Sequence, residues 1–200
     1  MNIYEAIYMP ENNINWAQVT KEEIACTPWE PVPHIRAWFQ VCWNETGLHV
    51  RMQAQEKDIV RNLTGPLDSI CDDSCLEFFF SPEPDGRYLN MEVNPNGAIN
   101  LGLRYDRYRY TRLTHKNFQN LLQVQPFTTE GGWGVEYMFP VTFLQLFYPG
   151  LALTAGKEMR ANFYKCGDCT PTPHYKTWNP VGTPSPDYHQ PAYFGNLILK

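Results

Sequence analysis

Apolar and polar residues alternate along several short segments, which is the pattern of strands with one buried face. Apolar side chains occupy the odd positions of residues 35–43 and the even positions of residues 48–55. The sequence between them, Asn-Glu-Thr-Gly at residues 44–47, is typical of a turn. These segments predict an antiparallel hairpin with one solvated face. Residues 15–20 are interpreted as a short edge strand ahead of it.

Further strands follow at short spacing. Residues 74–80 are strongly apolar and predict a central strand. The other predicted strands are residues 87–93, 98–105, 121–127, 133–139, 158–164 and 194–199. Pro140 is suited to the first turn of a short helix over residues 141–147.

Eight to ten strands joined by hairpins, with one or two short helices, predict an all-β fold. The economical architecture is a two-sheet antiparallel β-sandwich of immunoglobulin or jelly-roll type. A closed barrel is the alternative. Residues 1–200 are expected to form a single domain. The Pro-rich segment 166–193 is too long for a simple connection, and such loops are usually functional.

Composition narrows the function classes. The 200 residues carry a formal net charge of -5, which argues against broad binding to nucleic acids or anionic membranes. No apolar run approaches the roughly 18 residues of a membrane span. The N-terminal segment lacks the basic and apolar regions of a secretory signal, so we expect a cytoplasmic protein. The six cysteines are then expected to be free thiols.

Several motifs resemble one known family when they are taken in order. The sequence DDSCLEFFFSP at residues 72–82 resembles the DSxE-type strand of family 9 carbohydrate-binding modules, and residues 87–97 resemble the hairpin that follows it. Glu136 to Pro140 matches an E-x-x-I-P element of the same family. Residues 160–168 and 178–197 resemble its C-terminal segments. The resemblance runs from about residue 16 to residue 199.

The resemblance implies a β-sandwich that binds a sugar and has no catalytic activity of its own. Modules of this family hold a terminal sugar between two aromatic rings, while polar side chains bind its hydroxyl groups. The candidate sugar-binding residues are Trp178, Glu77, Arg104, Asn162, Tyr164 and His174. No catalytic residue or cofactor is expected, and the partner is a carbohydrate. The sugar and the oligomeric state are not predicted.

Each principal candidate has a structural alternative. Trp178 lies in the long loop beside polar residues and suits a stacking platform, but it could instead anchor the loop to the sandwich. Glu77 lies on the opposite face from its apolar neighbours, so it either lines a concave site or faces solvent in an Arg–Glu pair. The alternation around Trp133 favours the core.

The cysteines and acidic turns raise the question of a metal. Cys166 and Cys169 have metal-like spacing, with Asp168 and His174 nearby. Cys71 and Cys75 could supply further ligands only if the fold brings the two pairs together. Calcium, which is known in the family, is the alternative to no cofactor, with Asp72-Asp73 and Glu83 to Asp85 as candidate ligands.

Two other function classes stay open. Glu77, Glu92 and Glu136 lie on predicted strands and could act as a carboxylate pair in a small glycoside hydrolase. The domain could also be an interaction module without sugar binding. Residues 104–112 interleave four arginines with three tyrosines, a pattern that suits a phosphate, an acidic sugar or a solvated ribbon.

Overall fold

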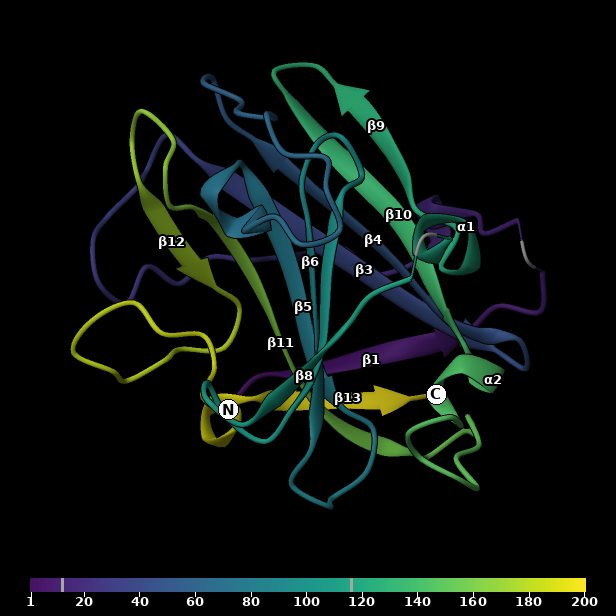
Figure 1. The fold of residues 1–200 in the computed structure, drawn as a ribbon. Helices are drawn as coiled ribbons and strands as arrows, with labels where there is room; N and C mark the ends of the chain where they lie inside the picture. The colour runs from purple at the N-terminus through teal and green to yellow at the C-terminus, as the bar shows by residue number, and fades with distance from the viewer. Residues whose placement is uncertain (12, 116) are drawn as a thin grey trace.

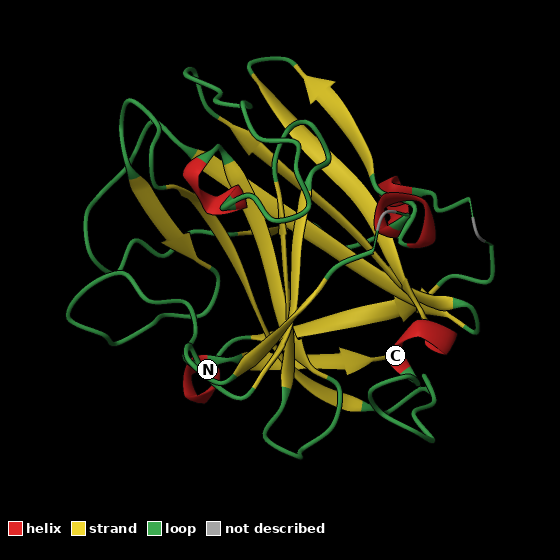
Figure 2. Cartoon of the chain, in the orientation of Figure 1, coloured by secondary structure: helices red, strands yellow, loops and turns green. Residues whose placement is uncertain are grey.

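The computed structural model describes residues 1–11, 13–115 and 117–200, and strands dominate it (Figure 1; Figure 2). The strands are β1 Ile3–Tyr8, β2 Glu22–Glu23, β3 Arg36–Asn44, β4 Gly47–Gln55, β5 Cys75–Ser81, β6 Tyr88–Val93, β7 Ile99–Arg104, β8 Tyr110–Leu113, β9 Gln125–Thr129, β10 Gly132–Pro140, β11 Glu158–Gly167, β12 His174–Thr177 and β13 Gly195–Leu199. The helices are α1 Phe118–Leu121 and α2 Val141–Leu144, with 3-10 turns at Trp16–Gln18, Ile70–Asp72 and Pro191–Tyr193. None of these helices is long and apolar enough to cross a membrane.

The strands form one sheet that curls into two packed layers. Its order is β8-β7-β6-β5-β11-β13-β1-β3-β4-β10-β9, with β12 beside β11 and β2 beside β3. The β5 side of this path forms one layer and the β4 side forms the other (Figure 1). The predicted all-β sandwich is confirmed.

The purely antiparallel arrangement is wrong at one place. β1 pairs in parallel with β13 and also with β3, and so it joins the two layers. The sequence analysis did not predict this strand, because residues 3–8 lack a long alternation and have no neighbouring hairpin partner. The edge strand expected at residues 15–20 is instead a 3-10 turn, with Asn15 capping the backbone N–H of Ala17.

The central hairpin forms as predicted. β3 and β4 pair antiparallel from Arg36 opposite Gln55 to Asn44 opposite Gly47. Its second face is less solvated than expected, because Gln40 is buried and donates hydrogen bonds to the carbonyl oxygens of Trp16 and Val19. The N-terminal segment therefore covers part of this face.

The main core lies between the layers. Phe39 of β3 stacks on Phe163 of β11 with ring centroids 3.5 Å apart, and Phe163 stacks on Phe78 of β5 at 4.6 Å. Alternation along β5 sends Leu76, Phe78 and Phe80 into this core. It therefore sends Cys75, Glu77 and Phe79 to the outer face of the β5 layer.

Candidate functional site

The outer face of the β5 layer is covered rather than exposed. A second apolar cluster lies there, in which Phe79, Tyr88 and Tyr164 pack against Tyr188 and Phe194. The covering residues come from the segment that follows β11, which folds back over the strands. Polar residues on this face are thereby removed from bulk water and gathered beneath a loop.

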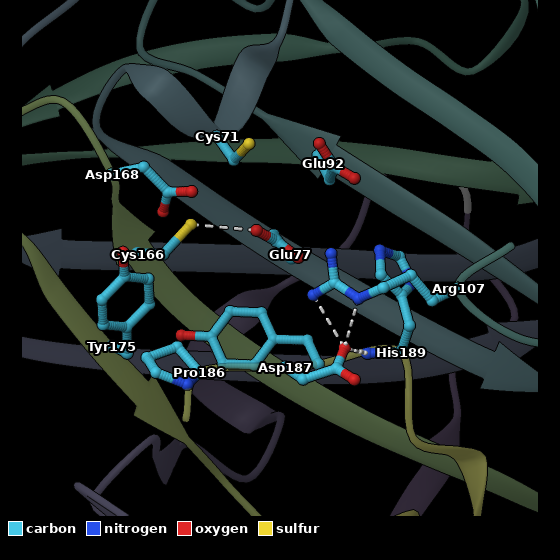
Figure 3. A pocket seen from close by; sticks show the side chains of 11 residues that line it. Cys71, Glu77, Glu92, Arg107, Cys166, Asp168, Tyr175, Pro186, Asp187 and His189 are labelled. Carbon is cyan, nitrogen blue, oxygen red and sulfur yellow. Dashed lines mark hydrogen bonds and ion pairs between the residues drawn. The ribbon is translucent and has the colours of Figure 1, made fainter. Parts of the chain in front are cut away.

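A pocket of about 110 Å³ opens between this face and the covering segment (Figure 3). Its wall has four carboxylates, three rings, two thiols, one guanidinium and one proline: Glu77, Glu92, Asp168, Asp187, Tyr175, Tyr188, His189, Cys71, Cys166, Arg107 and Pro186. A concave site with a few convergent polar groups and rings is the usual form of a small-molecule pocket.

Two carboxylates stand side by side on the pocket floor. Glu77 of β5 and Glu92 of β6 are direct cross-strand partners, and both are at most 5 % exposed. Burial is the main cause that raises the pKa of each, and the neighbouring Glu92 carboxylate raises that of Glu77 further. The thiol of Cys166 donates a hydrogen bond to Glu77 Oε1 at 2.9 Å. Both side chains are therefore placed to exchange hydrogen bonds with a ligand's hydroxyl groups.

A polar relay behind the floor orients Glu92. Arg104 Nε donates to Asn90 Oδ1 at 2.6 Å, and Asn90 Nδ2 donates to Glu92 Oε1 at 3.0 Å. Gly102 makes this possible, because a Cβ there would lie 2.5 Å from Asn90 Oδ1. Tyr110 covers the other side of the Arg104 guanidinium at 4.0 Å. Among the described residues, Glu92 Oε2 has no hydrogen-bond partner.

An ion pair fastens the covering segment to the β7–β8 hairpin. Arg107 Nη2 lies 2.9 Å from Asp187 Oδ1, and Asp187 also accepts hydrogen bonds from the backbone N–H of His189 and the side chain of Gln190. Figure 3 shows Arg107 and Asp187 together at the pocket wall. The pair therefore holds one positively and one negatively charged group at the pocket wall.

The rings of the pocket are held rigidly. Tyr188 stacks on Tyr164 with centroids 4.0 Å apart, and its hydroxyl donates to the carbonyl oxygens of Lys165 and Lys176. His189 stacks on Phe79 at 5.1 Å. Burial, followed by the charges of nearby arginines, lowers the pKa of His189 to about 3, so its ring is neutral near pH 7. The pocket thus offers preorganised ring surfaces next to its carboxylates.

The structure brings only some of the predicted site residues together. Glu77 lines the pocket, while Arg104 and Tyr164 lie directly behind its wall and orient residues that do. Asn162 is elsewhere: its side chain holds the backbone of Asn179 through hydrogen bonds of 2.8 and 3.0 Å. It fastens the covering segment to β11 and does not line the pocket.

The expectation that Trp178 is an exposed loop platform is wrong. Trp178 is 3 % exposed, and its ring packs edge-on against Phe39 and Phe163 in the main core. The reason is that the segment 166–193 is not all loop. β12 pairs with β11 just before Trp178, and the backbone N–H of Trp178 continues this pairing to Phe163. A tryptophan at the end of a paired strand enters the core.

His174 belongs to a buried charged cluster and does not line the main pocket. Lys165 Nζ donates to His174 Nε2 at 2.7 Å and lies 3.2 Å from Glu56 Oε1. Burial and the Lys165 charge lower the pKa of His174 to about 4. Glu56 also accepts a hydrogen bond from the Trp133 indole, at 2.5 Å, and Trp133 lies in the core as predicted. This cluster joins β11 to the end of β4 and is structural.

The arginines of residues 104–112 are all engaged. Arg107 pairs with Asp187 and Arg109 with Asp106, while Arg112 donates to the carbonyl oxygens of residues 67 and 68. Arg104 is held by Asn90. This segment is therefore a braced hairpin whose tip carries one pocket residue, Arg107.

The remaining carboxylate candidates are dispersed. Glu136 lies on β10 in the other layer and pairs with Arg51 at 3.1 Å, so it cannot join Glu77 and Glu92. Of the acidic groups considered for calcium, Asp73 accepts hydrogen bonds from Asn62, Leu63 and Asn94. Glu83 pairs with Lys157 and Asp85 with Arg87. Among the described residues, Asp73, Glu83 and Asp85 therefore form no shared cluster, and calcium binding stays a prediction.

Of the pocket residues, only Glu77 was predicted to bind the sugar, while Cys71, Cys166 and Asp168 were considered only as metal ligands. Glu92 was considered only as part of a catalytic pair, and Tyr175, Asp187, Tyr188 and His189 were not singled out. Their signal is weak, because they reach the pocket through the return of a long segment over the sheet. The pairing of Glu77 with Glu92 depends on the β5–β6 register, which the turn between these strands sets.

Comparison with known proteins places this geometry in a class. A protein of Bacteroides uniformis ATCC 8492 that is classed as carbohydrate-binding by inference has a TM-score of 0.84 at 23 % identity, over 99 % of both chains. A family 9 module of Caldicellulosiruptor kristjanssonii, solved with cellotriose, has a TM-score of 0.68 at 14 % identity, over 100 % of this chain and 94 % of that one. The same kind of module solved with glucose gives 0.65 at 14 % identity, over 100 % and 96 %. These likenesses show the β-sandwich fold of carbohydrate-binding modules.

The family itself is shown by sequence. The model of carbohydrate-binding family 9 matches residues 8–199, and the chain belongs to this family. The resemblance noted from the motifs is confirmed. A search of curated proteins found no match.

Proposed function

We propose that the pocket on the outer face of the β5 layer binds a sugar ring. The observation that carries this proposal is the meeting of paired buried carboxylates, Glu77 and Glu92, with the held rings of Tyr188 and His189. Carboxylates accept charge-assisted hydrogen bonds from hydroxyl groups, and the apolar C–H face of a sugar packs against a ring. Glu92 lines the pocket, where its carboxylate can accept a hydrogen bond from a ligand hydroxyl.

The neighbours suggest which sugars to test first. Two solved structures of family 9 modules from Caldicellulosiruptor kristjanssonii contain cellotriose and glucose. We therefore propose a glucose unit or the end of a β-glucan chain as the ligand of this pocket. The proposal concerns recognition of a ring at a chain end, since the covering segment encloses the pocket on one side.

We propose that the domain acts without catalysis. The family to which the chain belongs is one of binding modules. Glu77 and Glu92 are adjacent cross-strand partners on one floor, whereas the two carboxyls of a glycosidase flank the scissile bond. Incubation with cello-oligosaccharides should release no product sugar.

Calorimetric titration with cellotriose and glucose, after a glycan array, tests the sugar site. Removing a charge-assisted hydrogen bond costs about 1.5–3 kcal/mol, so Glu92→Gln and Arg107→Ala should each weaken binding about tenfold or more. Glu83→Gln is the matched control, because Glu83 is an acidic residue that pairs with Lys157 away from the pocket. It should bind as the unchanged protein does.

Three outcomes would change the proposal. Binding that survives both pocket variants places the sugar elsewhere. Release of product favours the small glycoside hydrolase. If the folded protein binds no glycan on the array, an interaction module is favoured.

We also propose that residues 1–200 act as one domain in a reducing compartment such as the cytoplasm, with neither nucleic acid nor membrane as a partner. All six cysteines are free thiols, and burial raises the pKa of Cys42 and Cys75 to about 12, which makes them unreactive. The engaged arginines of the β7–β8 hairpin support the absence of a nucleic-acid role. Cell fractionation and counting of reactive thiols after denaturation test these points.

A further inference from the structure

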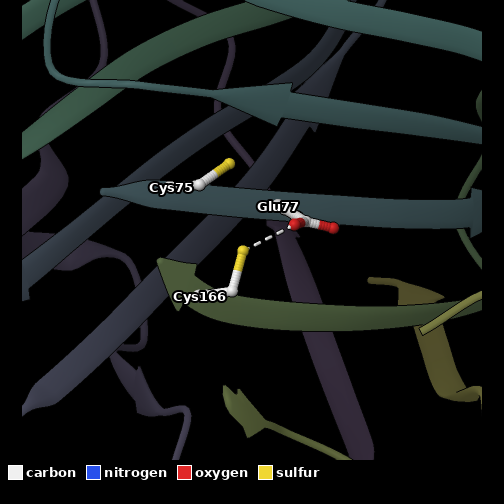
Figure 4. A group of neighbouring side chains, drawn as sticks. All are labelled: Cys75, Glu77 and Cys166. Carbon is white, nitrogen blue, oxygen red and sulfur yellow. Dashed lines mark hydrogen bonds between the residues drawn. The ribbon is translucent and has the colours of Figure 1, made fainter. Parts of the chain in front are cut away.

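Two thiols and a carboxylate meet beside the pocket, and two of the three, Cys166 and Glu77, line it. Cys75 of β5 and Cys166 of β11 are direct cross-strand partners, and Glu77 follows Cys75 on the same face (Figure 4). Their ligand atoms all lie within 4.8 Å of one another. The three residues are 0, 1 and 3 % exposed, so water does not separate them.

Sugar binding does not account for this arrangement. Thiols are weak hydrogen-bond donors and acceptors, and a hydroxyl group gains little from two of them. Among the described residues, neither Glu77 nor its neighbour Glu92 forms a close ion pair with Lys or Arg, and the charges of Arg104 and Arg112 act on them only from a distance. Buried carboxylates are normally paired with a cation or bound to a metal.

We propose that Cys75, Cys166 and Glu77 bind a thiophilic divalent cation, with zinc as the type. Cysteine sulfur and carboxylate oxygen are zinc ligands, and thiolates select zinc over calcium or magnesium. Tetrahedral zinc with ordinary bond lengths sets its ligand atoms about 3.5–3.8 Å apart. The observed atoms, 2.9 Å apart for Cys166 and Glu77 and within 4.8 Å overall, reach this spacing by shifts of about 1 Å or less.

Metal binding changes the protonation of the ligands at this site. Each thiol loses its proton to solvent as its sulfur bonds to the metal, and Glu77 binds as a carboxylate, so binding releases at least two protons and changes no oxidation state. Cys166 and Glu77 line the pocket, so a water molecule from the pocket could serve as the fourth ligand. This site departs from the sequence-based prediction that the domain needs no metal.

The sequence analysis allowed a metal site shared by the two cysteine pairs only if the fold brings the pairs together. The two cysteine pairs are brought together, because the backbone N–H of Asp168 bonds to Cys71 and that of Cys169 to Asp72. However, the ligand pair joins one cysteine from each motif, Cys75 and Cys166. Cys71 belongs instead to a second group at the pocket wall, with Asp72 and Asp168.

The test uses the full-length, reduced protein, freed of metal by a chelator and without sugar. Titration with Co²⁺ should give the intense absorption of tetrahedral cobalt with sulfur ligands, and Zn²⁺ should displace it at one ion per chain. Cys75→Ser and Cys166→Ser should each weaken zinc binding by about 100-fold or more, beyond the usual effect of losing a residue that only supports a ligand. Cys42→Ser is the matched control, because Cys42 is an equally buried thiol in the other layer.

A second measurement does not depend on the variants folding. Zinc should raise the melting temperature of the unchanged protein, and binding should release at least two protons. The proposal is overturned if no tetrahedral cobalt spectrum forms, if Cys75 and Cys166 instead form a disulfide on mild oxidation and bind no metal, or if only Cys71→Ser abolishes binding. Because sugar is absent throughout, failure of this proposal leaves the sugar site untouched, and the reverse also holds.

Discussion

Truncating Trp178 tests whether this residue stabilises the core or binds the sugar. The ring is 3 % exposed and contacts Phe39 and Phe163 with centroids 5.4 and 5.8 Å away. It also packs so closely on Gly195 that a Cβ there would lie 2.6 Å from the indole. A large aromatic residue cut to alanine in such a setting costs about 3–5 kcal/mol. In a domain of this size, each kcal/mol lowers the melting temperature by about 2–4 °C, which gives a fall of about 6–20 °C.

Urea unfolding of Trp178→Ala measures this cost, and cellotriose titration well below the melting temperature measures its effect on binding. We expect a large loss of stability and an affinity within about twofold of the unchanged protein. Trp38→Ala is the control, because Trp38 is only half-buried and its ring lies under Lys21 and Arg36. It should cost about 1 kcal/mol. A Trp178→Ala protein of normal stability that no longer binds sugar would refute the assignment of Trp178 to the core.

Three further changes test the parts that hold the site. Lys165→Met breaks the buried contact with Glu56 and should cost about 3–5 kcal/mol in urea unfolding, whereas Lys157→Met, at a half-exposed ion pair, should cost about 1 kcal/mol or less. Gly102→Ala should displace Asn90, cost about 1–3 kcal/mol in urea unfolding and weaken cellotriose binding in calorimetric titration; unchanged binding would show that Asn90 does not orient Glu92 for the sugar. Because the folded pKa of His174, about 4, lies below the unfolded value of about 6.5, its contribution to stability is full above pH 6.5 and falls as pH drops toward 4. At one pKa unit per 1.4 kcal/mol, this loss is about 2 kcal/mol at pH 5, and His174→Gln should remove that part of the pH dependence.

A strand could be predicted from the sequence where the pattern of apolar and polar residues within its own segment indicates it. β3 and β4 follow from apolar positions repeating every second residue, with the turn at residues 44–47 between them, and β5 follows from a continuous apolar run. β1 could not be predicted, because its partners lie at the other end of the chain and in a strand with which it shares no turn.

The candidate site shows the same limit. Glu77 was found because it interrupts the apolar side chains of its own strand. Tyr188, His189 and Asp187 reach the pocket only through the return of the chain over the sheet, and no local pattern encodes that path. Trp178 was misplaced for the corresponding reason: a four-residue strand in a Pro-rich segment has too little alternation to be recognised.

The placement of β1 between β13 and β3 has a consequence for the order of folding. β1, at residues 3–8, is synthesised long before one of its two neighbours, β13, at residues 195–199. The β3–β4 hairpin can form early, but the two layers cannot be closed along β1 until residues 195–199 have left the ribosome. Contacts of such sequence separation slow folding, since the chain must pay the loop-closure entropy before it gains the pairing. Refolding should therefore be limited by this closure, and a β13 variant such as Leu197→Ala should slow the final phase more than it slows hairpin formation.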